Sequence, residues 1–594
     1  MTNPLAEQPH GQGASLNRLV ALAVLGVICA GIGLRWRLLD VPLDRDEGEY
    51  AYIAQRMLRG VPPYESAYAM KLPGIYAVYA AVMSVAGESI RGIHLGLLAT
   101  GAATTGAMFL LGRRLYDSSV GLAAAAAFAL LSTLPQVHGS SAQAEAFVLL
   151  PTVLAWWLAV RVGDRLHAPA EEAATRQYGT LLVIGLLCGV AITIKQHAIF
   201  LMLGTVLYVG LARWRSAAGA KGRVKGSLLT LATVAVGGGL PSLVMVAAIV
   251  AAGVWEKFWF WTVVVAGNYA GELPWSDGWA RLRSNGLFVA DAAPAIFLLA
   301  GCGLAALFFD KVARQRRGFL IVTSLTALVA ICPGLHFRRH YFVLLLPAVS
   351  LLFAVGGIAV ARLAAKVRGT SVTGRSSSSV VSRFALLGKP AVVPKPGSEA
   401  VAPDAGSSPD VKVLLAIVAG VMLLALWSNR EHYFERSPAE IARATYGGNP
   451  FPEAVAIADY IRARTTPDET VLVMGSEPEI PFYAQRRSAT RHIYMYPLVE
   501  RQPYARQMQE EMIAEAEAAR PAYIVLAAVD TSWLAMDGAD RRLLEWFGGY
   551  TSEHYDLVGC IDVDGDRTIY KWGAGARDFR PRSNAWLKVY RRRE

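Results

Sequence analysis

The chain has 594 residues, of which 54% are hydrophobic and only 18% are charged. Because a soluble protein of this size carries about 25% charged residues, the composition excludes an ordinary soluble enzyme. The formal net charge is +12, but the basic residues lie in short loops between apolar segments and form no basic face with interleaved aromatics, which excludes nucleic acid as a partner.

The N-terminal segment 1–16 is polar, and we expect it to be disordered. After it come eleven apolar segments that we interpret as helices crossing roughly 30 Å of hydrocarbon. These predicted spans lie near residues 17–39, 91–112, 119–134, 145–162, 179–195, 197–212, 227–252, 285–309, 318–334, 341–362 and 411–428. Arg35, Trp36 and Arg37 end the first segment where a signal peptide would carry a small-residue cleavage site, which favours an uncleaved span.

The loop between the first two spans, residues 40–89, carries a dense cluster of acids. Asp44, Asp46, Glu47 and Glu49 follow the first span directly, and a helical period of apolar residues comes after them. Carboxylates at the mouth of a membrane bundle serve as bases or as cation ligands, so acid–base chemistry and a divalent cation are both compatible with the cluster. The alternative is a solvated helix start that the acids merely cap.

Basic residues between the spans predict the orientation of the chain. With the N-terminus inside, the strongly basic loops also fall inside, at residues 113–114, 161–176, 213–225, 311–317 and 362–412. The outer loop 135–144 then carries no Lys or Arg. The apolar segment 72–86 is short, and counting it as a span would move the later basic loops outside. We therefore expect it to form a helix on the outer face of the membrane.

Further charged residues belong to this same outer side. Glu145 begins a span, Lys71 ends the first loop, and Lys195 lies in a tight turn. A third basic feature, Arg338 to Tyr341, reads RRHY and precedes a late span. Cations and carboxylates on one face suit a reaction at an anionic group. The alternatives are an interfacial charge reaching water for Glu145 and contact with lipid headgroups for the two arginines.

The C-terminal third changes character. The membrane domain ends near residue 362, and residues 363–410 are rich in Ser, Gly and Pro, which predicts a flexible cytoplasmic linker. The last span, 411–428, returns the chain to the outer side, where residues 429–594 follow. Predicted strands at 469–474 and 521–527 alternate with predicted helices at 452–464 and 507–519. This alternation predicts a soluble α/β domain outside the membrane.

The first outer loop reads RDEGEYAYIAQRMLRGVPPY and ends in KLPG. It resembles the corresponding loop of the GT-C membrane glycosyltransferases, in particular the glycosyltransferase family 39-like branch similar to aminoarabinose transferases of lipid A and protein O-mannosyltransferases. The matching positions are Asp46 and Glu47, Tyr50 and Ala51, Val61 to Tyr64, and Lys71 to Pro73. Leu72 departs from the Lys-Pro-Pro run of that branch. The segments around Lys195 and RRHYFVLLLP also resemble family segments, so the resemblance covers residues 18–360.

The resemblance implies a GT-C-like bundle that transfers a sugar from a polyprenyl-phosphate donor to a hydroxyl or amine, with inversion. It implies catalytic acids at Asp46, the base, and its neighbour Glu47. Glu145 takes the family's second acidic position, where it would orient the acceptor or bind a cation. The phosphate would be held by Lys71, Lys195, Arg338 and Arg339, with His340 and Tyr341 as hydrogen-bonding groups.

Other functions stay open at this point. A multi-span transporter or a lipid-linked glycan flippase would also carry many spans, although the sequence has no clear internal repeat and its acids gather at one surface. A ligase that transfers a whole glycan is a third reading. For the glycosyltransferase, the acceptor is a lipid, a glycan or a protein. The expected location is a bacterial-type inner or plasma membrane, with the N-terminus cytoplasmic and the C-terminal domain extracytoplasmic.

Overall fold

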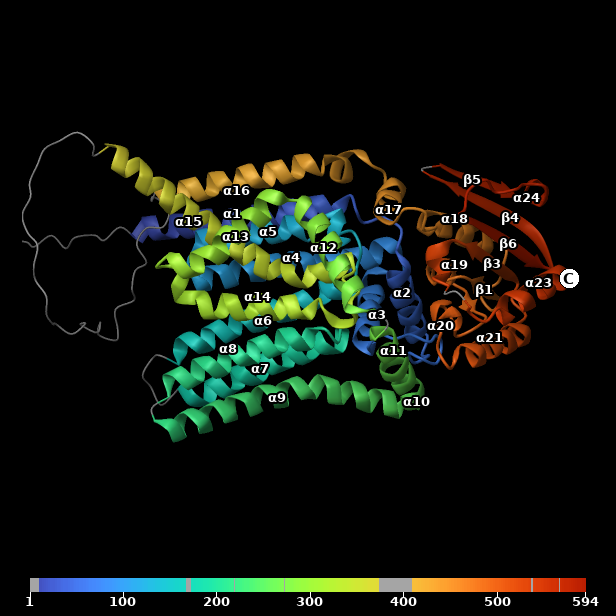
Figure 1. The fold of residues 1–594 in the computed structure, drawn as a ribbon, viewed down its shortest axis with the longest axis horizontal. Helices are drawn as coiled ribbons and strands as arrows, with labels where there is room; N and C mark the ends of the chain where they lie inside the picture. The colour runs from blue at the N-terminus through green and yellow to red at the C-terminus, as the bar shows by residue number, and fades with distance from the viewer. Residues whose placement is uncertain are drawn as a thin grey trace, which may run out of the picture.

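The computed structural model describes residues 10–166, 173–217, 219–271, 273–372, 409–535, 538–565 and 567–594. Figure 1 shows two parts in line along the longest axis, a helical bundle and an α/β domain that covers one end of it. The start of α1, the end of α15 and the start of α16 lie at the opposite end of the bundle.

The bundle is built from helices that coincide with the predicted spans. They are α1 (His10–Trp36), α4 (Ile90–Leu115), α5 (Ser118–Leu131), α6 (Ala144–Arg165), α7 (Ala173–Ile194), α8 (Ala198–Ser216), α9 (Ala220–Ala251), α12 (Trp275–Asp291), α13 (Pro294–Phe309), α14 (Arg317–Ala330), α15 (Leu346–Val372) and α16 (Pro409–Ser428). Within the described residues, eight helices are long and apolar enough to cross a membrane, and α12 with α13 adds a pair bent by 108°. The predicted class, a polytopic helical membrane protein with a soluble α/β domain, is confirmed.

Some boundaries differ from the prediction. Helix α1 already begins at His10, inside the segment expected to be disordered, and residues 1–9 lie outside the described residues. Helix α15 continues to Val372, inside the predicted linker, whose residues 373–408 also lie outside the described part. The predicted spans 119–134 and 318–334 correspond to α5 and α14, which have 14 residues each. Both nevertheless run along the long helices of the bundle in Figure 1.

The short helices α2 (Arg45–Leu58), α3 (Pro73–Ala86), α10 (Trp255–Trp259) and α11 (Ala266–Ala270) gather at the end of the bundle that faces the α/β domain (Figure 1). Further short elements of the chain are η1 (Pro135–Val137), the π-helix η2 (Phe260–Val265), η4 (Pro333–Leu335) and η5 (Arg339–Leu345). At the opposite end, η3 (Ala313–Arg316) precedes α14. Helix α3 begins with Pro73 at its first position, where a missing N–H costs nothing.

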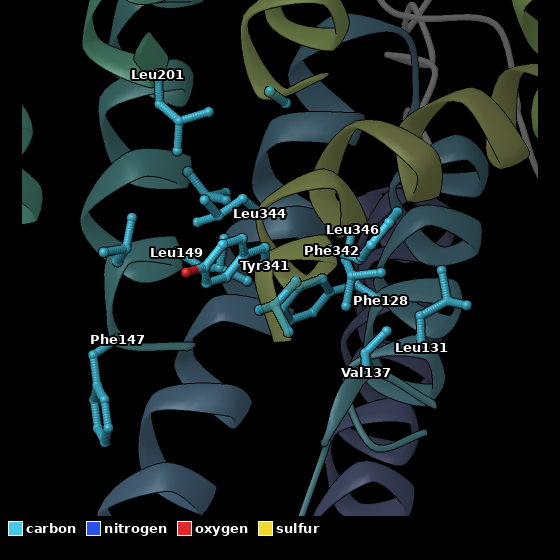
Figure 2. Close-up of a cluster of buried hydrophobic side chains, with 14 of the residues drawn as sticks. Phe128, Leu131, Val137, Phe147, Leu149, Leu201, Tyr341, Phe342, Leu344 and Leu346 are labelled. Atoms are coloured by element: carbon cyan, nitrogen blue, oxygen red, sulfur yellow. The ribbon is translucent and has the colours of Figure 1, made fainter. Parts of the chain in front are cut away.

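The late η5 segment is anchored in the apolar core. Figure 2 shows Tyr341, Phe342 and Leu344 packed among side chains of α5 and α6, with Leu201 of α8 nearby. These apolar contacts fix the start of η5, so the basic residues just before them are held at the end of the bundle.

The described strands of the C-terminal domain form one sheet of six in the order β2-β1-β3-β6-β4-β5. They are β1 (Thr470–Met474), β2 (Arg487–Ser488), β3 (Tyr523–Ala528), β4 (Tyr555–Asp564), β5 (Arg567–Trp572) and β6 (Trp586–Arg592). Strand β1 pairs in parallel with β2 and β3, whereas β6, β4 and β5 pair antiparallel. The predicted strands are β1 and β3, and the antiparallel half was not predicted.

Helices surround this sheet and link it to the bundle. They are η6 (Glu431–Glu435), α17 (Pro438–Tyr446), α18 (Phe451–Arg462), α19 (Glu479–Ala484), α20 (Tyr496–Val499), α21 (Ala505–Ala519), α22 (Asp530–Trp533), α23 (Arg542–His554) and α24 (Ala574–Arg577). The predicted helices correspond to α18 and α21.

The domain packs tightly on α2. A Cβ atom on Gly48 would lie 2.7 Å from the backbone nitrogen of Glu479, so only glycine permits this approach. Arg45 forms an ion pair with Glu477 at 2.9 Å, and Tyr483 receives a hydrogen bond from the backbone N–H of Leu43 at 2.8 Å. The first loop and the α/β domain therefore form one continuous structure.

Candidate active site

A cavity of about 630 Å³ lies between the domain-facing end of the bundle and the α/β domain. Its lining comes from segments that are far apart in sequence. It includes eight residues singled out from the sequence, namely Asp44, Asp46, Glu49, Lys71, Lys195, Arg338, His340 and Tyr341. It also includes residues of η2 and α11 and a group from the C-terminal domain. The structure therefore brings the predicted residues of the first loop and of two later segments to one place.

Asp46 and Lys71 form the centre of the cavity. The Lys71 ammonium lies 3.2 Å from Asp46 Oδ1 and 3.7 Å from Glu49 Oε2. Tyr494, from the C-terminal domain, donates its hydroxyl hydrogen to Asp46 Oδ1 at 3.2 Å, and Tyr76 donates to Glu49 Oε1 at 2.7 Å. Asp46 is thus held between a cation of the first loop and a tyrosine of the C-terminal domain.

The acids of α2 differ in electrostatics. Burial raises the pKa of Glu49 despite Lys71, and burial together with Glu47 and Asp46 raises the pKa of Asp44 to about 7. Burial would also raise the pKa of Asp46, but Lys71 and the other nearby cations hold it well below its usual range. Asp46 is therefore ionised at neutral pH, as a proton acceptor must be.

A second pair lies deeper in the site. Lys195 forms an ion pair with Glu145, whose side chain is fully buried. His340 Nε2 lies 3.8 Å from Glu145 Oε1, and the Lys195 ammonium lies 4.6 Å from the centre of the Tyr341 ring. Removing either member of such a buried pair would leave an uncompensated charge in an apolar setting. Glu145 is not part of the cavity lining, whereas Lys195 is. The ion pair with Glu145 therefore holds Lys195 in the cavity wall.

Two predicted residues point elsewhere. Glu47 is 1% exposed; it accepts hydrogen bonds from the backbone N–H of Asp44 and Ala142 and contacts His94 at 3.0 Å. Asp44 and Glu47 form the capping box of α2, so part of the acid cluster does cap a helix. Arg339 stacks on Phe288 at 4.2 Å and is absent from the described lining, whereas the exposed Arg338 belongs to it.

The site also contains residues that the sequence did not single out. Tyr446, Tyr494 and Tyr496 of the C-terminal domain line the cavity together with Gln143 and His138. Tyr446 and Gln143 both donate to Asp44 Oδ2, at 2.8 and 2.7 Å. No local motif marks these tyrosines, because their role depends on how the domain docks. For Gln143, the sequence offers one signal: it directly precedes α6 and lies two residues before Glu145.

The acid cluster does not form a recognisable metal centre. Among the described residues, no group of three or more His, Cys, Asp and Glu side chains has a geometry that could hold a metal ion. The carboxylates are bonded instead to Lys71, Lys195, tyrosines and backbone N–H groups.

Comparisons with known proteins agree with this architecture. The crystal structure of ArnT from Cupriavidus metallidurans bound to undecaprenyl phosphate is similar over 93% of this chain and 97% of that chain, with a TM-score of 0.53 and 15% identity. The profile of the family described as dolichyl-phosphate-mannose-protein mannosyltransferase matches residues 70–238. Fold and profile together define the class: the chain is a membrane glycosyltransferase with the GT-C fold.

More distant similarity extends to the oligosaccharyltransferase AglB from Archaeoglobus fulgidus, over 95% of this chain and 75% of that chain, with a TM-score of 0.45 and 13% identity. A search of the curated proteins found no similar sequence. The predictions of an enzyme and of its class are confirmed, and the chain is an integral membrane protein.

Proposed function

We propose that the enzyme transfers one sugar from a polyprenyl-phosphate donor to an acceptor hydroxyl or amine. The observation that carries the proposal is the meeting of Asp46 with Lys71, Lys195 and Arg338 around one cavity at the end of an apolar bundle. A lipid-linked donor needs an apolar path for its chain and cations for its phosphate, and this end of the bundle offers both. That the related fold of ArnT was solved with undecaprenyl phosphate supports the same donor class here.

In the proposed reaction, Asp46 accepts the proton of the acceptor group as the acceptor oxygen or nitrogen attacks the anomeric carbon. The bond between that carbon and the phosphate oxygen breaks, and its electron pair stays on the phosphate. Lys195, Arg338 and Lys71 stabilise the charge that develops there. Attack from the face opposite the phosphate inverts the anomeric centre.

Lys71 has a double role in this scheme. In the unliganded site it is paired with Asp46, which makes Asp46 ionised but weakly basic. A bound phosphate would share Lys71 and so weaken its hold on the carboxylate. The basicity of Asp46 would then rise only when the donor is present, which limits proton uptake in its absence.

Orientation is part of the proposal. The basic loops favour an inner side that holds the N-terminus and an outer side that holds the cavity and the C-terminal domain. The expected location is a bacterial-type plasma membrane. Reporter fusions test this orientation: a fusion within 373–408 should be cytoplasmic and one after Glu594 external, and the reverse result would contradict it.

The activity is tested with membranes that contain the full chain and radiolabelled polyprenyl-phosphate sugars of several kinds. Transfer of label to a membrane-associated product, absent from membranes without the chain, is the expected result. Parallel reactions with EDTA test whether transfer requires a divalent cation, which the acid cluster could bind. Movement of the labelled lipid across the bilayer without any sugar transfer would contradict the proposal and support a transporter instead.

A further inference from the structure

Besides the cationic residues, the cavity lining includes a group of polar and aromatic side chains. We name it the acceptor lobe; its residues are Asp44, His138, Gln143, Tyr446, Asn449, Phe451 and Tyr496. Interactions join these residues to one another: Tyr446 contacts Asp44 and the ring of His138, and Asn449 contacts Arg45. Tyr494 connects the lobe to Asp46, because its ring lies 5.4 Å from that of Tyr496 and its hydroxyl reaches the carboxylate.

Two polar atoms of the lobe have no hydrogen-bond partner among the described residues. Gln143 is 3% exposed, and its amide nitrogen donates to Asp44 Oδ2, which turns its carbonyl oxygen away from the carboxylate. In the described part of the chain, neither this oxygen nor His138 Nδ1 has a hydrogen-bond partner. Burial lowers the pKa of His138 to about 3, so its ring is neutral. Buried polar atoms of this kind are normally satisfied, which indicates a ligand that carries hydrogen-bond donors.

Aromatic rings form the wall beside these atoms. Tyr446 and Tyr496 are half-buried, and the Arg45 guanidinium lies 5.6 Å from the Phe451 ring and 5.8 Å from the Tyr496 ring. A tyrosine offers an apolar ring face and a polar hydroxyl in one side chain. A sugar ring has the matching arrangement, since its C–H face packs on an aromatic ring while its hydroxyls bond at the edge.

The residues of the acceptor lobe include no Lys or Arg, which disfavours a phosphorylated acceptor. The Asp44 carboxyl forms part of its floor, and the Arg45 guanidinium is already bonded to the carbonyl of Ser476, to Asn449 and to Glu477. A peptide acceptor that binds by adding a strand to a sheet edge is also disfavoured. Of the strands described, β2 and β5 are the edges of the sheet, and neither contributes to the cavity lining.

We propose that the acceptor lobe binds a neutral glycan, and that the enzyme glycosylates one of its hydroxyl groups. This inference rests on the proposed transfer reaction and names its acceptor. The hydroxyl would pass its proton to Asp46 and form the new bond to the anomeric carbon, while the polyprenyl phosphate leaves. Tyr446, Tyr496 and Gln143 hold the acceptor sugar, and their contribution is to acceptor binding and not to donor binding.

The first test identifies the labelled product made by the unchanged full-length chain in membranes. Label in material that resists protease and solvent extraction, but yields to glycosidases or periodate, supports the inference. Label released as peptide, or extracted as a phosphorylated lipid, overturns the inference and leaves the transfer reaction standing. No transfer at all overturns the proposed function and this inference with it.

The second test uses variants, with the glycan fraction from the first test as acceptor. Tyr496→Ala and Gln143→Met should each raise the KM for this fraction about tenfold, the loss expected for one stacking or buried hydrogen-bonding contact. The thermal shift produced by undecaprenyl phosphate should stay as in the unchanged chain, which also shows that the variants fold. Tyr570→Ala is the matched control, because Tyr570 is an exposed tyrosine of β5 outside the cavity lining. An unchanged acceptor KM in both variants, or a lost response to undecaprenyl phosphate, would overturn the assignment.

Discussion

Replacement of Lys71 by methionine tests how the proposed base is tuned. Lys71 Nζ lies 3.2 Å from Asp46 Oδ1, and both side chains are about a quarter exposed. At that separation the attraction is about 1.3 kcal/mol with the dielectric constant of water and about 5 kcal/mol with an effective value near 20. Since about 1.4 kcal/mol equals one pKa unit, loss of Lys71 should raise the pKa of Asp46 by at least about one unit.

The sign of the effect follows from the charge of Lys71. A cation stabilises the ionised carboxylate. In the unchanged enzyme, Asp46 should therefore stay ionised at pH values well below 4, the usual pKa of an aspartate. In Lys71→Met the acid limb of kcat/KM should move to higher pH, toward the usual range near pH 4; initial transfer rates of the detergent-solubilised enzyme are measured from the lowest pH at which it stays folded up to pH 8. The donor KM should rise as well, because a phosphate-binding cation is lost. An acid limb at the same pH in both enzymes would refute the coupling between Lys71 and Asp46.

Two further predictions concern the support of the site. Glu145→Gln leaves Lys195 buried without its partner and should lower stability by about 3–5 kcal/mol, whereas Glu88→Gln at an exposed pair should change it by less than about 1 kcal/mol. Thermal unfolding in detergent compares the two, and equal Tm values would contradict the structural role of Glu145. Gly48→Ala places a Cβ against Glu479 and should displace the C-terminal domain, costing about 1–3 kcal/mol and most of the transfer activity. Limited proteolysis should then release the domain, while Gly33→Ala, with open space around the new Cβ, should resist cleavage as the unchanged chain does.

Much of the fold could be predicted because hydrophobicity alone defines a membrane helix. The spans carry long apolar runs, and each predicted segment overlaps a helix, but the predicted single span 285–309 is wrong because it falls on α12 and α13, which are bent by 108°. The ends of the helices are harder to predict from hydrophobicity. Helix α1, for example, begins at His10, before its apolar run, because no residue there prevents a helical backbone. The antiparallel half of the sheet escaped prediction because strands such as β5, Arg567–Trp572, are polar and half-exposed and lack the apolar runs that marked β1 and β3.

The site was predictable only where a residue belongs to a local motif. Asp46 and Lys71 stand in the first loop, and the structure brings them together as that motif implied. Glu47 belongs to the same motif, yet it faces inward and caps α2, because neighbouring residues of a helix point in different directions. Tyr494 could not be found from the sequence, since its contact with Asp46 depends on the docking of a domain that begins hundreds of residues later.

The central claim is that Asp46 is the base of the transfer reaction. Its most direct test is the rate of sugar transfer by Asp46→Asn from a radiolabelled polyprenyl-phosphate donor, with Asp40→Asn as the control. Asp40 belongs to the same loop and forms an exposed ion pair with Arg91 at 3.5 Å. Asp46→Asn should lower kcat by about a hundredfold to ten-thousandfold while undecaprenyl phosphate still binds, whereas Asp40→Asn should transfer sugar normally. Full activity of Asp46→Asn would contradict the claim that Asp46 is the base.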